Sequence, residues 1–461
     1  MKLAAVLASL VIAGCATAPE IDASRLPAAP AQFKEHARWT SAAPAEAQPR
    51  GEWWKAFADP VLDDLVERAG RSNASVQVAA ARLAQARAIA GVVDSQRALQ
   101  LGVQATASRF GGVVDGARVP ASTLGTAGAA LSYELDLFGK LSRASEAARL
   151  DAQAREGLLQ STRLLVQADV AQSYLALRAT DAERSLVRGT LAAYRATLDL
   201  TERRYAAGDV AELDVARART EVAATESELL ALERRRAELE HSLAVLVGET
   251  ASAFAVEADD WRTALPVIPA GIPATVLARR PDVSAAQSSM LASRERVGAA
   301  RAAWFPDIAL TTTGGYASTE LGDLFKWSAR AWGVGALLSL PVLDGGRREA
   351  GVLDANARLD ESIARYREQV MVAFRDVEDQ LAALRLLAAQ STAQARAVDA
   401  AARATDLSNA RYLGGYVSQL ELLDARRSEL HNRRQALQVR SAQYQATVKL
   451  VRALGGGWGD A

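Results

Sequence analysis

The stretch Arg204-Tyr205-Ala206-Ala207-Gly208-Asp209-Val210 returns in altered form as Arg411-Tyr412-Leu413-Gly414-Gly415-Tyr416-Val417, 207 residues further along the chain. The same shift places Gly128-Ala129-Ala130-Leu131-Ser132 on Gly335-Ala336-Leu337-Leu338-Ser339. One ungapped shift that holds over roughly 150 residues indicates two structural repeats. A duplication of this length is typical of a symmetric, closed assembly rather than of an enzyme with one asymmetric pocket.

The placement of proline predicts long helices on both sides of these two stretches. The chain has 13 prolines, but none lies between Pro120 and Pro266, and none follows Pro341. Proline-free segments rich in Ala, Leu, Arg and Glu favour uninterrupted helices. We expect hairpin turns at Gly208 and Gly415, where glycine supplies a left-handed cap. The predicted helices span about 73–98, 141–204, 213–247, 281–303, 348–411 and 419–453.

Helices of this length need partners. The 141–204 helix would measure roughly 95 Å, and an isolated helix that long is not stable in water without packing. Coiled-coil packing against the second helix of its own hairpin is the expected solution.

Four shorter segments alternate between apolar and small or polar residues, which is typical of strands with two different faces. The strands are expected at about 99–110, 126–138, 306–316 and 330–343, with loops at 111–125 and 317–329. Gln104, Thr106 and Ser132 lie on the polar face, which would line a bore. A soluble hairpin packed on a core is the alternative. The strand length of about ten residues and the polar opposite face favour a membrane barrel. Because a closed barrel needs about eight strands, it would be shared among subunits.

The composition excludes several functional classes. Lys plus Arg and Asp plus Glu both number 54, so the net charge is zero, and no basic footprint for nucleic acid is present. The three histidines, His36, His241 and His431, are isolated from other metal-ligating residues. No nucleophile motif or phosphate-binding glycine loop occurs. We therefore expect no enzyme, no metal site and no cofactor other than a covalent lipid.

The N-terminus explains the single cysteine. Lys2 precedes an apolar run from Leu3 to Ile12, as in a secretory signal. The run ends at Ile12-Ala13-Gly14-Cys15, which resembles a bacterial lipobox. This resemblance implies cleavage before Cys15 and lipid attachment there, and Ala16 by analogy favours retention in the outer membrane. An ordinary signal peptide with an incidental cysteine is the alternative.

The expected organisation follows from these signals. Residues 1–14 are the signal peptide, and residues 15–50, rich in Ala and Pro, form a lipid-anchored extended tether. The first repeat spans 51–247, the second 281–454, and 248–280 connect them. Residues 455–461 form a C-terminal tail.

Several strings together resemble the TolC-like outer-membrane efflux family, in particular its OprM/NodT lipoprotein branch that serves RND pumps. The similarity covers nearly the whole chain after residue 50. The strings are Trp53-Trp54-Lys55-Ala56-Phe57-Ala58-Asp59-Pro60, Glu134-Leu135-Asp136-Leu137-Phe138-Gly139-Lys140, Arg279-Arg280-Pro281-Asp282-Val283, Phe305-Pro306-Asp307, Leu422-Leu423-Asp424-Ala425-Arg426 and Ala453-Leu454-Gly455-Gly456-Gly457-Trp458.

The resemblance implies a mainly α fold with a membrane β-hairpin part. Three copies would build an α-barrel from their long coiled-coil hairpins and a shared 12-stranded β-barrel from four strands each. The expected partners of this homotrimer are outer-membrane lipid, a periplasmic adaptor and an inner-membrane RND transporter. The expected function is that of a passive exit duct for drugs or other small molecules.

A gate is expected at the helical turns, which lie farthest from the strands. Leu420 and Asp424 share one face of a helix, and the resemblance transfers to them a hydrophobic constriction and an acidic ring. Each repeat also has an acid six residues after its turn glycine, Asp214 and Glu421. The alternative is that these acids only favour helix N-termini, at about 0.3–1 kcal/mol each.

The turns are also the expected site of adaptor docking by resemblance, with Tyr205, Gly208, Tyr412 and Gly415 as its residues. For the two tyrosines, packing across their own hairpins is the favoured interpretation. The family often has a basic residue at the position of Val417, so a specific ion-pair latch there is in doubt.

Two other functions stay open. The chain could be the outer-membrane duct of a type I protein secretion system, because the bore itself is generic. It could also be a periplasmic coiled-coil scaffold, although a scaffold would not need the alternating hairpins.

Overall fold

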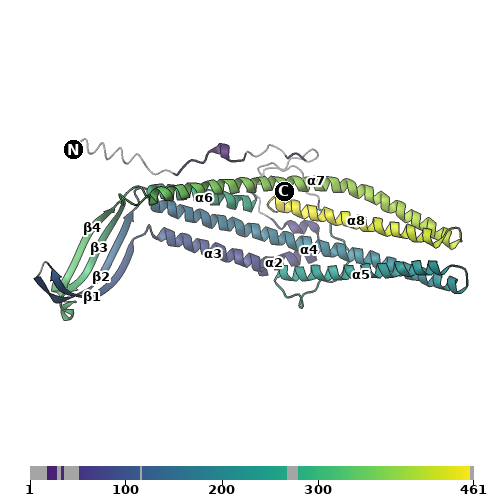
Figure 1. The fold of residues 1–461 in the computed structure, drawn as a ribbon, viewed down its shortest axis with the longest axis horizontal. Coiled ribbons are helices and arrows are strands. Elements are labelled where there is room, and N and C mark those ends of the chain that lie inside the picture. The colour runs from purple at the N-terminus through teal and green to yellow at the C-terminus, as the bar shows by residue number, and fades with distance from the viewer. Residues whose placement is uncertain (1–17, 28–32, 36–50, 115–116, 267–278, 457–461) are drawn as a thin grey trace. The chain divides into compact units, whose positions relative to one another are not determined.

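The computed structural model describes residues 18–27, 33–35, 51–114, 117–266 and 279–456. Its helices repeat with the 207-residue shift. The equivalent pairs are α3 (Ala74–Ser95) and α6 (Pro281–Ala302), α4 (Lys140–Ala206) and α7 (Arg347–Leu413), and α5 (Glu212–Val247) and α8 (Gln419–Ala453). The six predicted helices are thus confirmed, and α4 and α7 each contain 67 residues. Figure 1 shows α4 running beside α5, and α7 beside α8.

The chain divides into two compact units. The first contains Met1–Pro27, Ala81–Gly157 and Ser284–Glu368. Its centre is a four-stranded antiparallel sheet with the order β1-β2-β3-β4 (Figure 1). The strands are β1 (Gln100–Val114), β2 (Ala117–Leu135), β3 (Asp307–Ser318) and β4 (Arg330–Ser339). Since β1 and β4 each have one neighbour, the sheet has two open edges.

The first β-hairpin, formed by β1 and β2, differs from its prediction. Residues 111–125 were expected to be a loop, but β1 and β2 continue through most of this range. The pairing shifts between Phe110 and Gly112, and Pro120 lies opposite this irregularity, where no regular ladder bond is needed. A Cβ at Gly111 would lie 2.9 Å from Cα of Ala121, so the two backbones approach closely there.

The second hairpin agrees better with its prediction. Between β3 and β4 the chain forms two short 3-10 helices, Leu321–Asp323 and Trp327–Ala329. Strand β4 ends at Ser339, four residues before the predicted end, because Pro341 cannot donate a ladder hydrogen bond.

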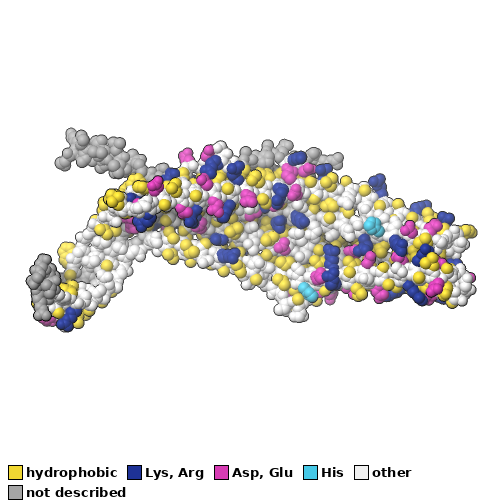
Figure 2. All heavy atoms as spheres, viewed as in Figure 1, with side chains coloured by type: hydrophobic (Ala, Val, Ile, Leu, Met, Phe, Trp, Pro, Cys, Tyr) yellow, Lys and Arg dark blue, Asp and Glu magenta, His cyan; other side chains and the backbone are white. Residues whose placement is uncertain are grey.

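The helices of the first unit pack on a small apolar core. Met290 and Val297 of α6 contact Ala355, Leu359 and Ile363 of α7. In α4, the guanidinium of Arg143 forms an ion pair of 3.1 Å with the buried carboxylate of Glu295. Figure 2 shows that the visible surface of the strands carries hydrophobic and uncharged side chains, whereas charged side chains gather over the helices.

The second unit contains Ala28–Ala80, Leu158–Val283 and Gln369–Ala461. Its first α-helix is α2 (Pro60–Ser72), which follows the 3-10 helix Trp53–Phe57 and whose N-terminus is capped by the carboxylate of Asp59. Aromatic side chains join the connector to α8, because the Trp261 and Tyr444 ring centroids lie 4.9 Å apart. On the other side of Tyr444, the ring of Phe57 stacks at 6.2 Å.

The described parts of the predicted tether are not free of packing. In the first unit, Ile21 and Leu26 pack against the apolar core, and Arg25 pairs with Asp360 at 2.7 Å. In the second unit, Phe33 is buried, and its ring centroid lies 6.1 Å from that of Phe374.

Main-chain contacts fix the register of the part around Phe33. The carboxylate of Glu378 accepts hydrogen bonds from the backbone N–H groups of Lys34 at 2.6 Å and Glu35 at 3.1 Å. The carboxylate of Glu35 in turn pairs with Arg385 at 2.8 Å. This part of the N-terminal segment is therefore docked on α7.

Candidate functional site

The two helical turns have the same backbone. After α4, the N–H of Gly208 donates to the carbonyl of Tyr205 at 2.9 Å, and that of Asp209 to Arg204 at 2.8 Å. After α7, Gly415 donates to Tyr412 at 3.0 Å, and Tyr416 to Arg411 at 2.8 Å. This is the Schellman pattern. Gly208 has φ +82° and Gly415 +74°, so the predicted left-handed glycine caps are confirmed.

The second turn opens α8 with an exposed apolar and acidic face. Leu420 is 45% exposed, and Glu421 and Asp424 are also exposed, whereas Leu422 and Leu423 are fully buried. Leu420 and Asp424 are therefore on one face, opposite the side that packs against the hairpin. Glu421 lies 3.9 Å from Arg411, and Asp424 has no ion-pair partner among the described residues.

The first turn presents a different set at the equivalent positions. Leu213 corresponds to Leu420 and is also exposed, and Asp214 corresponds to Glu421. The position of Asp424 is taken by Arg217, which pairs with Asp214 at 3.9 Å. Each turn therefore carries one pair of an acid and a base, and the second turn has in addition Asp424, which has no ion-pair partner among the described residues.

The two tyrosines before the turns are buried to different extents. Tyr412 is 5% exposed, and the guanidinium carbon of Arg204 lies 5.7 Å from its ring centroid. Tyr205 is 46% exposed. Packing of both tyrosines across their hairpins stays a prediction, because exposure alone does not test it. The sequence could not show the difference in burial, since Arg204, which contacts the Tyr412 ring, belongs to the other repeat.

A partly buried arginine of α8 contacts α4 behind the second turn. Nη1 of Arg426 donates to the hydroxyl of Thr197 at 2.5 Å, and Nη2 donates to the side-chain oxygen of Asn409 at 3.2 Å. Burial lowers the pKa of Arg426, and burial raises the pKa of the nearby Tyr194 to about 12. The arginine has no carboxylate within ion-pair distance among the described residues.

Two further arginines of α8 form ion pairs with the first hairpin. Arg427 pairs with Glu221 of α5, and this hydrogen bond raises the pKa of the arginine. Arg434 pairs with Glu183 of α4 at 2.7 Å and with Glu228 of α5 at 3.0 Å. The helical hairpin α7–α8 is thus held to the helical hairpin α4–α5 by these ion pairs. The sequence did not predict them, since no spacing rule connects residues about 200 positions apart.

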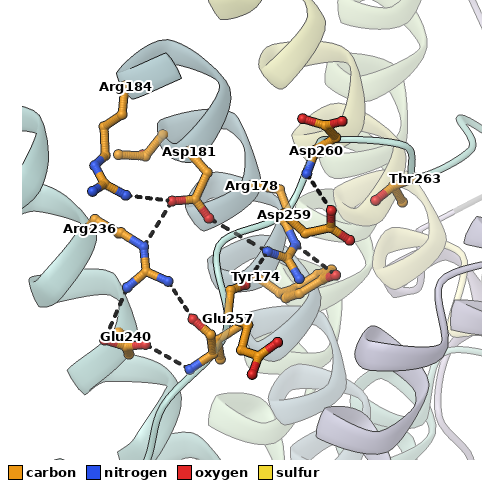
Figure 3. A network of polar contacts seen from close by, with 12 residues as sticks. Tyr174, Arg178, Asp181, Arg184, Arg236, Glu240, Glu257, Asp259, Asp260 and Thr263 are labelled. Carbon is orange, nitrogen blue, oxygen red and sulfur yellow. Dashed lines mark hydrogen bonds and ion pairs between the residues drawn. The ribbon is translucent and has the colours of Figure 1, made fainter. Parts of the chain in front are cut away.

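A buried polar network lies where the connector passes the helical hairpin α4–α5 (Figure 3). Asp181 is its centre, with Arg236 at 2.8 Å, Arg184 at 3.1 Å and Arg178 at 3.6 Å. Three cations around one buried carboxylate require further acceptors, because each buried guanidinium must satisfy its N–H groups.

The connector supplies these acceptors from its backbone (Figure 3). Arg178 donates to the carbonyl of Glu257 at 2.7 Å, and Arg236 donates to the carbonyl of Val256. Glu240 accepts from the N–H of Val256 at 2.7 Å. The network therefore fixes the path of the connector, and Arg178, Val256 and Glu257 also line a cavity of about 500 Å³ beside α2.

The strand residues predicted to line a bore share one face. Gln104 pairs with Gly128 and Thr106 with Thr126 across the first hairpin, and the Thr106 and Thr126 hydroxyls lie 2.7 Å apart. Ser132 is on the same side of the sheet, opposite Gln100. This face is mainly small and polar, and its large apolar members are Phe110, Leu124 and Leu337.

Neither a metal centre nor a membrane-spanning helix is found in the part of the chain that the structure describes. No cluster of three or more His, Cys, Asp or Glu side chains there is placed to hold a metal ion. Among the same residues, no helix is both long enough and apolar enough to cross a membrane. Cys15 lies outside the described residues.

The sheet with two open edges and two unlike faces, joined to paired 67-residue helices, defines a channel-forming protein whose barrel is completed by further copies. The model of the outer membrane efflux protein family matches the chain twice, over residues 65–249 and 272–456. The chain belongs to this family. It is an outer-membrane channel component of efflux pumps, not an enzyme.

Individual relatives agree along their full lengths. The chain is 30% identical over 460 residues to the probable outer membrane lipoprotein SilC of Salmonella typhimurium, covering 99% of both. It is 32% identical over 466 residues to the pyoverdine export outer membrane protein OpmQ of Pseudomonas aeruginosa, covering 99% of this chain and 97% of OpmQ. The solved structure of the outer-membrane channel OprN has a TM-score of 0.89 at 29% identity, covering 96% of this chain and 100% of OprN.

Proposed function

We propose that this chain is the passive exit duct of a tripartite RND-type efflux pump, closed at rest by the start of α8. The observation that carries the gate is the exposed face of Leu420 and Asp424, on a helix whose intervening residues Leu422 and Leu423 are fully buried. Three copies of this face around one axis would form an apolar ring beside an acidic ring. Apolar constrictions gate by dewetting, and acidic rings favour cations.

The two secondary gate residues, Glu421 and Asp214, contribute unequally to the negative charge near the axis. Glu421 lies next to Asp424 and adds charge to the acidic ring, although Arg411 partly neutralises it. Asp214 is paired with Arg217, so its contribution to the field on the axis is smaller. The free carboxylate of Asp424 is therefore the main determinant of cation preference.

The same turns are the proposed docking site of a periplasmic adaptor. Gly208 and Gly415 lack side chains and leave the backbone accessible at the two turns. Tyr205, which is half exposed, is available to an adaptor, whereas Tyr412 supports the turn from within. An inner-membrane RND transporter would complete the pump.

The proposed processing follows the domain boundaries expected from the sequence. Residues 1–14 are removed and Cys15 is acylated, so residues 15–50 run from the membrane to the first repeat at 51–247. The naming of SilC as a lipoprotein supports this step. The connector at 248–280, the second repeat at 281–454 and the tail at 455–461 complete the chain.

The cargo is set by the transporter rather than by this chain. Pyoverdine is the export substrate in the name of OpmQ, and the generic polar bore described above carries no recognisable ligand pocket. A type I secretion system would use the same bore, and no observation favours it over efflux.

Single-channel conductance in planar bilayers tests the gate. Wild-type trimers should give small, cation-preferring steps. The double variant Leu420→Ala with Asp424→Ala should give larger steps with weaker cation preference. The matched control is Leu213→Ala with Arg217→Ala, which changes the equivalent positions of the first turn and should leave step size nearly unchanged. An equal response to both double variants would place the gate elsewhere.

A further inference from the structure

Strand pairing assigns every side chain of the sheet to one of two faces, because neighbours on paired strands point to the same side. The face opposite the predicted bore is almost entirely apolar. Its described members are Leu101, Val103, Ala105, Ala107, Arg109, Thr123, Gly125, Ala127, Ala129, Leu131, Tyr133, Leu135, Ile308, Leu310, Thr312, Gly314, Tyr316, Arg330, Trp332, Val334, Ala336 and Leu338.

Only two of these residues are charged, and both are arginines. Arg109 lies on β1 and Arg330 on β4, which are the two edge strands. Each is nine residues from the end of its strand nearest the helices, Gln100 for β1 and Ser339 for β4. The two arginines therefore lie equally far along their strands from the helical ends. The register aligns Arg330 with Ala105 through Tyr316 and Ala127, so the tilt of the strands brings the two arginines to one level.

This level coincides with the expected outer boundary of a membrane. Nine residues extend roughly 30 Å along a strand. A strand tilt of about 40° reduces this to a height of roughly 23 Å, close to the apolar band of about 25 Å in outer-membrane barrels. The helices lie at the other end of the strands, so the arginines are at the external side.

Aromatic side chains gather at the same level. Trp332 and Tyr316 belong to the face, and Trp332 is 83% exposed. From the β3–β4 loop, Phe325 packs edge-on against Tyr316 at 5.7 Å. Trp327, which is 72% exposed, lies under the guanidinium of Arg330, 3.1 Å from ring centroid to guanidinium carbon. Such residues are typical of the interface between apolar lipid and headgroups.

The charges of the two arginines are not neutralised by any residue that the structure describes. Neither has an ion-pair partner among the described residues, although Lys326 in the same loop pairs with Asp323 at 2.6 Å. Nε of Arg330 donates to the carbonyl of Trp327 at 2.8 Å, which orients the guanidinium and leaves its terminal nitrogens available. An unneutralised guanidinium at the rim of an apolar surface fits an anionic oxygen group.

We propose that Arg109 and Arg330 bind phosphate groups of phosphorylated lipids in the outer leaflet of the outer membrane. Since β1 and β4 are edge strands, barrel closure places Arg109 of one copy on the strand next to Arg330 of another. Each junction between copies would then hold one lipid headgroup, with one phosphate at each arginine and with Trp327 and Trp332 against the sugar or acyl part. The inference rests on outer-membrane family membership and is independent of the gate.

Native mass spectrometry of detergent-solubilised trimers tests this site. The probes are lipid A with two phosphates, its one-phosphate form, and phosphatidylcholine as a lipid without net charge. Wild type should bind them in that order of affinity. A single charge-assisted contact changes affinity about tenfold, so Arg109→Gln with Arg330→Gln should weaken lipid A binding about a hundredfold.

The controls separate charge from geometry and folding. Lys326→Gln removes one positive charge from the same loop and should leave binding unchanged. Lysine in both arginine positions should restore part of the affinity, because lysine binds phosphate as a point charge. Trimer elution and tryptophan fluorescence check that each variant is folded.

Three results would overturn the proposal. The first is equal binding of one- and two-phosphate lipid A by wild type. The second is unchanged lipid A affinity in a folded double glutamine variant. The third is displacement of lipid A by inorganic phosphate at the same concentration, which would identify a site for a free anion instead of a lipid.

Discussion

Just before their short helices, the two repeats make the same contact with different side chains. In the first repeat, the amide of Asn73 donates to the carbonyl of Leu246 at 2.8 Å, near the end of α5. In the second, the guanidinium of Arg280, 207 residues later, donates to the carbonyl of Ala453 at 3.2 Å. The backbone partner is conserved across the duplication, while the donor has changed from neutral to charged.

The change of charge has a local consequence. Arg280 is buried and pairs with Asp282 at 2.7 Å and Asp376 at 3.4 Å. Burial alone would lower its pKa, but the two carboxylates raise the pKa above its ordinary value. Asp169 is the equivalent of Asp376, and Asn73 takes the position of Arg280 in the first repeat. Desolvation raises the pKa of the Asp169 carboxyl, and the charge of Arg452 offsets this only in part. Duplication thus preserved geometry more strictly than charge.

The largest expected effect comes from Arg280→Met. It leaves the partly buried Asp282 without its cation and leaves Asp376 with Arg375 alone, at 2.9 Å, which should lower the free energy of unfolding by about 3 kcal/mol. The matched variant Asn73→Ala removes a neutral helix cap and one hydrogen bond, and should cost about 1 kcal/mol. Thermal unfolding of purified trimers compares the two.

A rescue variant tests the cause. Adding Asp376→Asn to Arg280→Met removes one of the two carboxylates that have lost their ion pair with Arg280, and it should recover part of the lost stability. If the double variant were less stable than Arg280→Met, the charge argument would be wrong, and packing of the arginine side chain would explain the loss.

The turns give the next comparison. Tyr412→Ala should destabilise the protein by about 3 kcal/mol, because it removes a buried aromatic side chain. Tyr205→Ala should change stability by less than about 0.5 kcal/mol, since this tyrosine is half exposed. Tyr412→Phe should be nearly neutral, because the Tyr412 hydroxyl is buried with no hydrogen-bond partner. Similar losses for both alanine variants would contradict the difference in burial.

The smallest effect concerns Asp169. Its raised folded-state pKa means that the folded protein favours the neutral carboxyl, so stability falls as pH rises through that pKa. Asp169→Asn should therefore raise the unfolding temperature at pH 7, with no gain below about pH 4, where the aspartate is protonated in both states. Asp376→Asn is the control and should act in the opposite direction at pH 7, because Arg280 loses a partner. A stabilising effect of both variants would refute the assignment.

The elements could be predicted where local sequence determines them. Proline gaps and the turn glycines placed α4, α5, α7 and α8 nearly to the residue, and the alternation of apolar and polar residues located the four strands. The extent of the first hairpin was missed, because glycine, serine and threonine between positions 111 and 125 resemble a loop although the residues continue as strands.

The candidate site was only partly accessible from sequence. Spacing along one helix put Leu420 and Asp424 on a common face, and their exposure in the structure agrees with that. The arginines that hold α8 to the first hairpin, and the network around Asp181, join residues of different elements. No local pattern encodes such contacts, so they could be found only once the chain was folded.

The docking of the N-terminal segment on α7 has a consequence for biogenesis. Lys34 and Glu378 are separated by 344 residues, so the partner of this segment is translated near the end of synthesis. The N-terminal segment around Lys34 is therefore synthesised early but docks late. Before it docks, this segment is accessible to chaperones and proteases. Its docking can therefore report that α7 has been synthesised.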